Sequence, residues 1–147
     1  MFENVKKIFD NAIKLDELEA FKRAVDNEIK ELIIQMNTKE QLGELGIDSL
    51  GRDLGEYADF TIEERTKKGL QVGHIDFKVT GDYWRSWEVK VVGDVIEISV
   101  DKFRFDELVY DLRFSEKHVG LTDENLTELA GEMLKRYRDY VIDKLFT

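Results

Sequence analysis

Residues 41–86 read QLGELGIDSLGRDLGEYADFTIEERTKKGLQVGHIDFKVTGDYWRS, and the rest of the chain is organised around this stretch. It holds most of the ten glycines and is only weakly periodic. Gly43, Gly46, Gly51 and Gly55 are spaced too regularly for a random linker, and each suits a positive φ or a close backbone approach. A connection this long is uncommon in a compact domain unless it has a function. We therefore expect a structured loop that carries the functional surface.

One short helix is expected inside the loop. Thr61 is the predicted N-cap of a helix over residues 62–68, with Glu64 as the reciprocal acid of a capping box. Gly69 follows the last helical residue, where glycine commonly ends a helix.

The N-terminal part has a clear helical period. Apolar residues at three- and four-residue steps predict an amphipathic helix over residues 2–14. A new helix is predicted to begin after Asp16, which is a candidate N-cap, and Glu19 is in the capping-box position. The apolar face then continues to Met36, so the segment is either one bent helix or two helices. The helix is predicted to end at residues 37–38. The apolar stripe is expected to be core or protomer contact.

Strand signals begin after the loop. Residues 74–79 alternate between apolar and polar side chains, which predicts a strand with one solvated face. Residues 89–100 form two alternating runs around a Gly-Asp turn at 93–94, the pattern of a β-hairpin. Residues 103–105 are expected to continue as a strand or a short extension. Residues 106–119 suit an edge segment or a short helix.

The C-terminal part is the most strongly patterned. Thr122 is a predicted N-cap, and an apolar helical face follows it to the end of the chain. The fold class is therefore α+β, with N-terminal helices and a long C-terminal helix packed on a small antiparallel sheet. At 147 residues we expect one domain with four parts: helical residues 1–37, an extended loop with a short helix at 38–73, a β-hairpin sheet at 74–105, and a helical part at 106–147.

Composition narrows the function. The chain has no cysteine, which excludes thiol nucleophiles, disulfides and cysteine-ligated zinc. A net charge of −10 opposes general nucleic-acid binding, which rewards lysine and arginine. We expect no secretory signal, because the first residues run into a charged amphipathic segment, and no membrane span, because no apolar run approaches the ~18 residues required.

One pattern is compatible with catalysis. Asp76 or Asp82, followed by Glu88 and Lys90 on one strand face, matches the D…E-x-K arrangement of Mg²⁺-dependent nucleases. The alternative is that Glu88 and Lys90 form the solvated side of a strand, which a highly charged chain produces easily.

Other ligand patterns are weaker. His74 and His118 are far apart and are expected to be surface or loop histidines, so zinc chemistry has little support. The acidic residues between positions 101 and 111 lack the order of a calcium loop. We therefore assign no catalytic residue, metal or cofactor from these patterns, and the resemblance described below implies that the protein is not an enzyme.

A concentration of basic and aromatic side chains favours a protein interface. Arginine and large aromatic residues are what the buried centres of interfaces prefer. The predicted protein-interface residues are Leu54, Tyr57, Phe60, Arg65, Lys68, Tyr83, Trp84 and Arg85.

The central stretch resembles a family of small virion proteins of tailed phages, common in phages of Bacteroidetes-type bacteria. In layout it is more distantly similar to the neck and tail-completion proteins of the Mu G-like and HK97-like groups. The resemblance covers about two-thirds of the chain. The matching pieces are Gln41-Leu42, Gly46-Ile47-Asp48-Ser49-x-Gly51, Leu54-Gly55-x-Tyr57, Thr61-Ile62, Lys68-Gly69, Thr80-Gly81-x-Tyr83, Ser86 and Gly120-Leu121-Thr122-Asp123-Glu124-Asn125.

The resemblance implies a structural role in the virion, assembled in the host cytoplasm. The subunit would form a homo-oligomeric ring at the portal–tail junction, and the central loop would reach a neighbouring protomer. Its partners would be portal, adaptor or tail proteins, with no membrane and no sequence-specific nucleic acid, and DNA would pass through the lumen. Two other functions stay open: the Mg²⁺-dependent nuclease, and a small phage-encoded inhibitor of one host protein.

Overall fold

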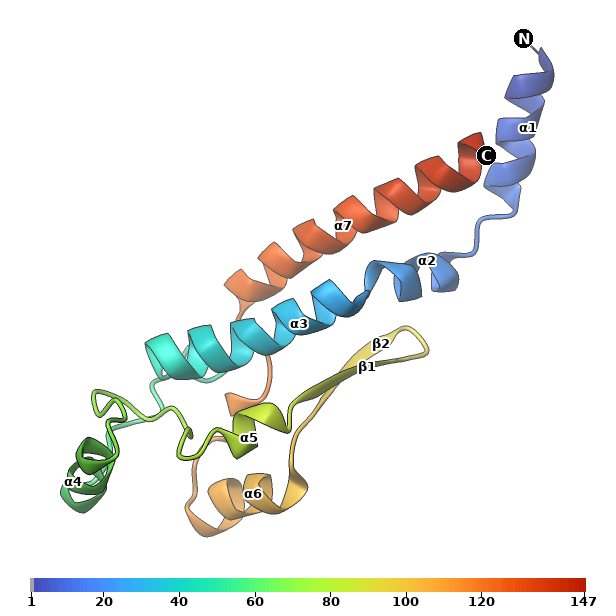
Figure 1. Cartoon of the computed structure of the whole chain (residues 1–147). Helices are drawn as coiled ribbons and strands as arrows, with labels where there is room; N and C mark the ends of the chain where they lie inside the picture. Colours follow the sequence, from blue (N-terminus) through green and yellow to red (C-terminus); the bar gives the residue numbers. More distant parts are fainter. Residues whose placement is uncertain (1) are drawn as a thin grey trace.

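The computed structural model describes residues 2–147 and confirms the α+β fold. The molecule is elongated: helices run along its length, and a two-stranded antiparallel hairpin lies beside them (Figure 1). Helix α1 and the C-terminal end of α7 lie side by side at one end (Figure 1). Helices α4 and α6 project at the opposite end (Figure 1).

The N-terminal part folds into three consecutive helices, α1 (Phe2–Ile13), α2 (Glu17–Ala24) and α3 (Asn27–Gln35). The cap predicted at Asp16 is confirmed, since its carboxylate accepts hydrogen bonds from the backbone N–H groups of Leu18 and Glu19. A second cap was missed: Asp26 accepts from the Ile29 N–H at 2.9 Å. This second aspartate begins a new helix, although the apolar face runs on without interruption.

Helix α3 continues directly into the π-helix η1 (Met36–Leu45). The stop predicted at residues 37–38 is wrong, because the Thr38 hydroxyl donates back to the Ile34 carbonyl at 2.7 Å and leaves the helix intact. The η1 helix ends at Gly46, which has a φ of 63°. A Cβ at Gly46 would lie 2.7 Å from the His74 ring, so both conformation and space require glycine. The loop predicted over residues 38–73 therefore starts only after residue 45.

The helical layer is completed by α7 (Asp123–Phe146). Its predicted N-cap is confirmed: Thr122 Oγ1 accepts from the Asn125 N–H at 3.3 Å. Helix α7 packs along α1, α2 and α3. Arg136 joins it to the start of α3, since its guanidinium contacts the carboxylates of Asp26 at 2.7 Å and Glu28 at 2.9 Å.

The predicted hairpin is confirmed as β1 (Glu88–Val92) and β2 (Val95–Ser99). The strands are antiparallel with Val89 opposite Ile98, and Gly93 takes the positive φ that a two-residue turn requires. Alternate side chains of β1 pack against α3 and α7. The buried residues of this first apolar cluster are Val25, Ile29, Ile33, Met36, Val89 and Leu129.

The central segment contains α4 (Asp59–Lys67) and α5 (Asp82–Arg85). Helix α4 begins at Ala58, whose carbonyl accepts from the Ile62 N–H, so Thr61 lies inside the first turn and is not the predicted N-cap. The predicted end is confirmed. Gly69 has a φ of 70°, and the N–H groups of residues 69 and 70 bond back to the carbonyls of residues 66 and 65, a Schellman motif.

The strand predicted over residues 74–79 does not form. Phe77 has a φ of 58°, which interrupts any extended run, and the Asp76 carboxylate accepts the Lys78 N–H that a strand would give to a ladder. Ile75, Asp76 and Phe77 are buried one after another and Lys78 and Val79 are exposed, so burial does not alternate as it would along a strand. It packs instead into a second apolar cluster, whose buried residues are Leu42, Ile75, Phe77, Tyr83, Trp87 and Leu108.

Residues after the hairpin are helical. They form α6 (Lys102–Asp106), the π-turn η2 (Glu107–Asp111) and the 3₁₀ turn η3 (Glu116–His118). The strand predicted at residues 103–105 is wrong, because the Asp101 carboxylate accepts the Arg104 N–H and starts a helix. The alternative left open for residues 106–119 is resolved in favour of helix.

Candidate protein-interface site

A buried ion pair between Arg65 of α4 and Asp76 organises the central segment. Arg65 Nη2 lies 3.0 Å from Asp76 Oδ1 and 3.2 Å from Oδ2, and the two side chains are only 5% and 4% exposed. The other guanidinium nitrogens donate to the carbonyls of Gln71 at 2.9 Å and Lys78 at 2.6 Å. One arginine thus holds the returning chain against α4.

Further donors surround the Asp76 carboxylate. Gln71 Nε2 donates to it at 2.8 Å, and so does the Tyr57 hydroxyl. The Tyr57 ring centroid lies 4.3 Å from the Arg65 guanidinium carbon, a cation–π contact. Burial raises the pKa of Tyr57 to about 12, so its hydroxyl stays protonated and keeps donating at neutral pH. Trp84 adds a bond from Nε1 to the Asp76 carbonyl at 2.9 Å.

A second buried network lies around His118, which is fully enclosed. His118 Nδ1 lies 2.6 Å from the Ser115 carbonyl, so Nδ1 carries the proton and donates. Nε2 therefore accepts from the Tyr83 hydroxyl at 2.7 Å. Burial lowers the pKa of His118 and raises that of Tyr83, so both side chains are neutral at neutral pH. The expectation of a surface histidine is wrong for His118, while His74 is half-buried with Nε2 2.7 Å from the Gly43 carbonyl.

Acidification is expected to destabilise the protein through His118. Its folded-state pKa lies below the unfolded value of 6.5, so the unfolded chain binds the proton more readily. Stability is therefore full above pH 6.5 and is lost as the pH falls from there toward the folded-state pKa, by at most about 1.4 kcal/mol per pH unit. Urea unfolding at several pH values between 7 and about 5 measures this slope.

Two variants identify the group responsible. His118→Asn should remove the slope in this window. Tyr83→Phe should keep it, because burial and not the tyrosine hydroxyl is the main cause of the lowered pKa. An unchanged slope in His118→Asn would contradict the assignment.

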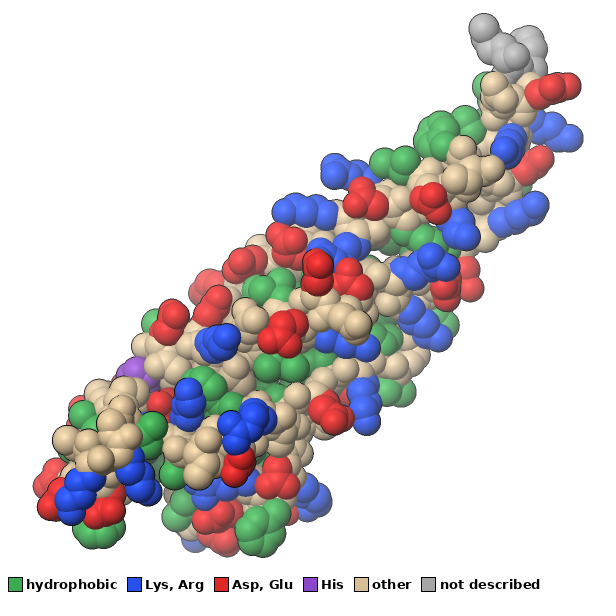
Figure 2. All heavy atoms as spheres, in the orientation of Figure 1, with side chains coloured by type: hydrophobic (Ala, Val, Ile, Leu, Met, Phe, Trp, Pro, Cys, Tyr) green, Lys and Arg blue, Asp and Glu red, His purple; other side chains and the backbone are tan. Residues whose placement is uncertain are grey.

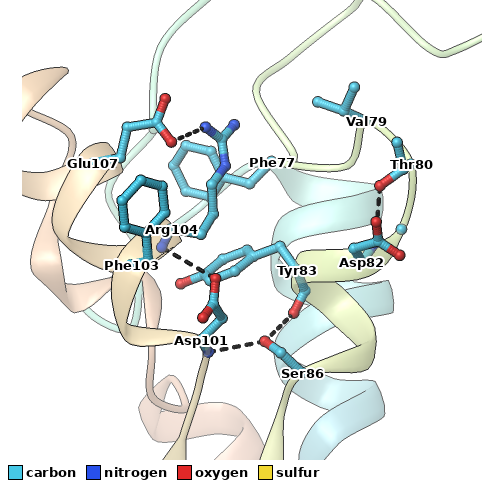
Figure 3. A pocket seen from close by; sticks show the side chains of 11 residues that line it. Phe77, Val79, Thr80, Asp82, Tyr83, Ser86, Asp101, Phe103, Arg104 and Glu107 are labelled. Atoms are coloured by element: carbon cyan, nitrogen blue, oxygen red, sulfur yellow. Dashed lines mark hydrogen bonds and ion pairs between the residues drawn. The ribbon is translucent and has the colours of Figure 1, made fainter.

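A recess lies between the central segment and α6, with a volume of about 540 Å³ (Figure 3). Its polar groups bond to one another along the walls. The Ser86 hydroxyl donates to the Tyr83 carbonyl at 2.6 Å and accepts from the Asp101 N–H, while Arg104 pairs with Glu107 at 2.7 Å (Figure 3). The Ser86 hydroxyl is thus held by backbone groups on both sides. The recess is therefore better suited to binding an apolar side chain than to catalysis, because its polar groups already bond to one another.

Phe77 separates this recess from a second, which we call the α4–η2 groove. The groove has a volume of about 440 Å³, and its apolar lining includes Ile75, Phe77, Leu108, Leu112 and Phe114. Phe77 packs edge-on against Phe114 at 5.1 Å and His118 at 4.9 Å between ring centroids. Its positive φ is unusual for a bulky residue, and such strained positions often accompany functional surfaces.

Exposed aromatic residues lie outside the lining of the α4–η2 groove, on the helices that flank it. Phe60 on α4 is 74% exposed, and Tyr110 on η2 is 68% exposed. Phe103, on the adjoining α6, is 81% exposed. Apolar side chains are visible on both projections at this end of the molecule (Figure 2). Large exposed side chains around an apolar recess are typical of protein-binding surfaces.

The predicted interface residues fall into three groups. Arg65 and Tyr83 are buried and bonded inside the chain, which corrects their expected place on a surface, because each satisfies a buried polar partner. Leu54, Tyr57 and Trp84 are half-buried beside the second apolar cluster. Phe60, Lys68 and Arg85 are exposed, and for these an interface role remains a prediction.

The central loop is less extended than predicted. Most of the segment packs back on the body of the protein, because Asp48, Ile75 and Phe77 are buried there. Only α4 stands out from it (Figure 1).

The structure separates the residues of the candidate nuclease pattern. Asp76 is enclosed by Arg65, whereas Asp82 pairs with Arg85 on the surface. Glu88 and Lys90 are both exposed and lie 3.6 Å apart, as expected for the solvated face of a strand. Within residues 2–147, no group of three or more histidine or acidic side chains is placed to hold a metal ion.

Sequence reasoning missed three buried polar residues that shape the site. Asn37, Gln41 and Asp48 are at most 1% exposed. Asp48 accepts hydrogen bonds from Arg52 and from the Ser115 hydroxyl. Burial raises the pKa of Asp48, but the hydrogen bonds to its carboxylate outweigh burial and lower the pKa. A signal for two of them was present in the sequence. Asn37 and Gln41 are four residues apart, so both lie on one face of the helix that continues to Leu42.

Comparisons of this chain with protein families, with curated proteins and with solved structures found no match. In the part of the chain that the structure describes, none of the helices combines the length and the apolar character needed to cross a bilayer.

Proposed function

We propose that this protein is a structural subunit of a tailed-phage virion, a neck (head–tail connector) or tail-completion protein that acts through protein–protein contacts in a ring. Support comes from the ordered resemblance of residues 41–125 and from an acidic chain, with a net charge of −10, that suits a lumen conducting DNA without binding it. Its partners would be further copies of itself and portal, adaptor or tail proteins.

The observation that carries this proposal is the α4–η2 groove. Its lining is largely apolar, and the buried Arg65–Asp76 pair fixes one wall in place. The flanking helices carry the exposed Phe60 and Tyr110 beside it. A preorganised surface loses little conformational entropy on binding, so its exposed aromatic side chains can act as anchors. We assign this groove to a neighbouring virion protein.

Replacing an anchor with a charge is expected to weaken that contact strongly. Phe60→Asp and Tyr110→Asp should each cost about 2 kcal/mol of binding, a weakening of roughly 30-fold, because a carboxylate would be desolvated in the contact. Titration calorimetry with the purified portal, adaptor and tail proteins of the same phage measures the effect. Val95→Asp on the hairpin is the matched control, since Val95 is 53% exposed and lies outside the groove.

Mass spectrometry of purified particles provides the independent test. The protein should be present in stoichiometric amounts. Absence from particles, together with capture of a single host protein, would instead favour the inhibitor. Equal binding by Phe60→Asp, Tyr110→Asp and the parent protein would remove the groove from the contact.

A further inference from the structure

Helix α1 is half-buried on one face and exposed on the other. Its half-buried face, with Ile8 and Asn11, lies toward α7, and Asn11 Nδ2 donates to the Leu145 carbonyl at 3.1 Å. Val5, Phe9 and Ile13 follow one another at four-residue steps and are 46%, 66% and 82% exposed. Between residues 3 and 13, where side chains are described, none is buried. We call Val5, Phe9 and Ile13 the outward row.

An apolar groove lies next to the α1–α2 connection, between α2 and α7. It has a volume of about 500 Å³, and its only charged lining residue among those described is Glu17. Its other walls are Phe21 and Ala24 of α2 with Ala130, Met133, Leu134 and Tyr137 of α7. Leu134 and Tyr137 are 64% and 41% exposed, so the apolar face of α7 is wider than the part that α2 and α3 cover. We call this the α2–α7 groove.

The chain's own α1 does not fill the α2–α7 groove. No described residue of α1 lines it, and residues 14–16 are the whole connection between α1 and α2. One chain therefore carries an uncovered amphipathic helix and an unfilled apolar groove, both at the same end of the molecule (Figure 1).

We propose that the outward row of α1 from one copy packs into the α2–α7 groove of a second copy. The inference rests on the proposed function, because that function requires different surfaces of identical subunits to meet. A donor helix and an acceptor groove are such a pair, and repeated donation closes either a reciprocal dimer or a ring.

The uncovered area is large enough for this contact. Eight large apolar side chains are exposed on α1, α2 and α7 around the groove. At on the order of 100 Å² each they total about 800 Å². In a reciprocal dimer, where both patches of each copy are buried, this is one partner's share of a standard interface, and in a ring it is the total area of each contact. The side chains are Val5, Phe9, Ile13, Leu18, Leu134, Tyr137, Ile142 and Phe146.

Charge also favours α1 of a second copy as the occupant of the α2–α7 groove. Residues 2–14 carry three lysines against two acids, although the chain as a whole has a charge of −10. This locally basic helix is therefore attracted to an acidic second copy and to Glu17 in the groove.

Cysteine pairing tests the contact directly, because the chain has no cysteine of its own. Ile13→Cys and Leu134→Cys are made as separate proteins and mixed under mild oxidation. We expect the mixed disulfide between them to form at least ~10-fold faster than that of a matched pair, Ile13→Cys with Val95→Cys, since proximity raises the effective concentration. Equal rates for the two mixtures would overturn the proposal.

Self-association gives the second readout. Phe9→Asp and Leu134→Asp should each raise the dissociation constant of the oligomer, measured by sedimentation at several concentrations, by about 30-fold. Val95→Asp on the hairpin, which lies outside both grooves, should leave it unchanged. Circular dichroism confirms that each variant keeps its helices.

The outcomes separate the two proposals. An oligomer that Phe9→Asp and Leu134→Asp leave intact overturns the α1 contact and retains the ring subunit. If Leu134→Asp abolishes binding to another virion protein and leaves self-association unaffected, the α2–α7 groove belongs to that protein. This result also overturns the α1 contact. A protein that is monomeric at every concentration and binds no virion protein overturns both.

Discussion

Replacing Arg65 with methionine is expected to destabilise the protein by about 3–5 kcal/mol, because it leaves the Asp76 carboxylate charged and buried without its cation. Asp76 is 3% exposed, so water cannot take over from the guanidinium. Arg65 also donates to the carbonyls of Gln71 and Lys78, and these acceptors would lose their partner at the same time. Urea unfolding should show a lower midpoint with an unchanged m-value.

A double-mutant cycle separates the ion pair from the rest of the network. Asp76→Asn keeps the size of the side chain and removes its charge. The double variant Arg65→Met/Asp76→Asn should therefore be more stable than the two single costs predict, with a coupling of about 1–3 kcal/mol. If the changes in the free energy of unfolding are strictly additive, Arg65 and Asp76 contribute to stability independently.

The ion pair also links stability to the proposed binding surface. Arg65 forms part of the α4–η2 groove, so the Arg65→Met variant should lose protection from hydrogen exchange first in α4 and in residues 70–79. The hairpin and α3 share the first apolar cluster and should stay protected longer. This order would show that the site is held by the central network alone.

Local signals in the sequence were enough for most helices and the hairpin. The caps at Asp16 and Thr122, the end at Gly69 and the turn at Gly93 all act within five residues, so neighbouring positions contain the whole interaction. The break at Asp26 could have been found in the same way. Its carboxylate caps the next helix at 2.9 Å, but the continuous apolar stripe hid it.

Residues 74–79 show why the site was harder to predict. Their alternation indicates a strand, yet Asp76 takes its partners from positions 57, 65 and 71, which no periodic pattern contains. A buried acid stays charged when such distant donors converge on it. Tertiary contacts therefore overrode the local period.

The burial of two predicted interface residues was hard to predict for a related reason. Arginine and large aromatic side chains mark the centres of interfaces, but the same types also build buried polar networks. Arg65 and Tyr83 belong to such networks, whereas Phe60 and Arg85 are on the surface. Composition alone cannot separate the two cases, because burial depends on how the chain returns after α4.

Replacing Gln41 with leucine is expected to destabilise the protein by about 3 kcal/mol, because three polar groups at the start of α7, one buried and two half-buried, lose their partner. Gln41 is fully buried. Its Nε2 donates to the Gly120 carbonyl at 2.8 Å, and its Oε1 accepts from the Thr122 N–H at 3.0 Å and from Asn125 Nδ2 at 2.8 Å. In a capping box the N-cap N–H is satisfied from within the same helix. Here Gln41 of η1 supplies that acceptor from 81 residues away, so the loss detaches two elements from each other.

Thr122→Ala is the matched control, because it removes the cap of α7 and leaves Gln41 in place. Loss of a cap alone typically costs about 1 kcal/mol, so Gln41→Leu should be clearly more destabilising. Hydrogen exchange distinguishes the mechanisms: Thr122→Ala should expose the first turn of α7, whereas Gln41→Leu should also expose residues 118–121 and the end of η1. Equal costs and equal exchange patterns would mean that the helix cap, and not the bridge from η1, holds this junction together. A larger cost for Gln41→Leu means that the π-helix places this side chain where the C-terminal helix must begin.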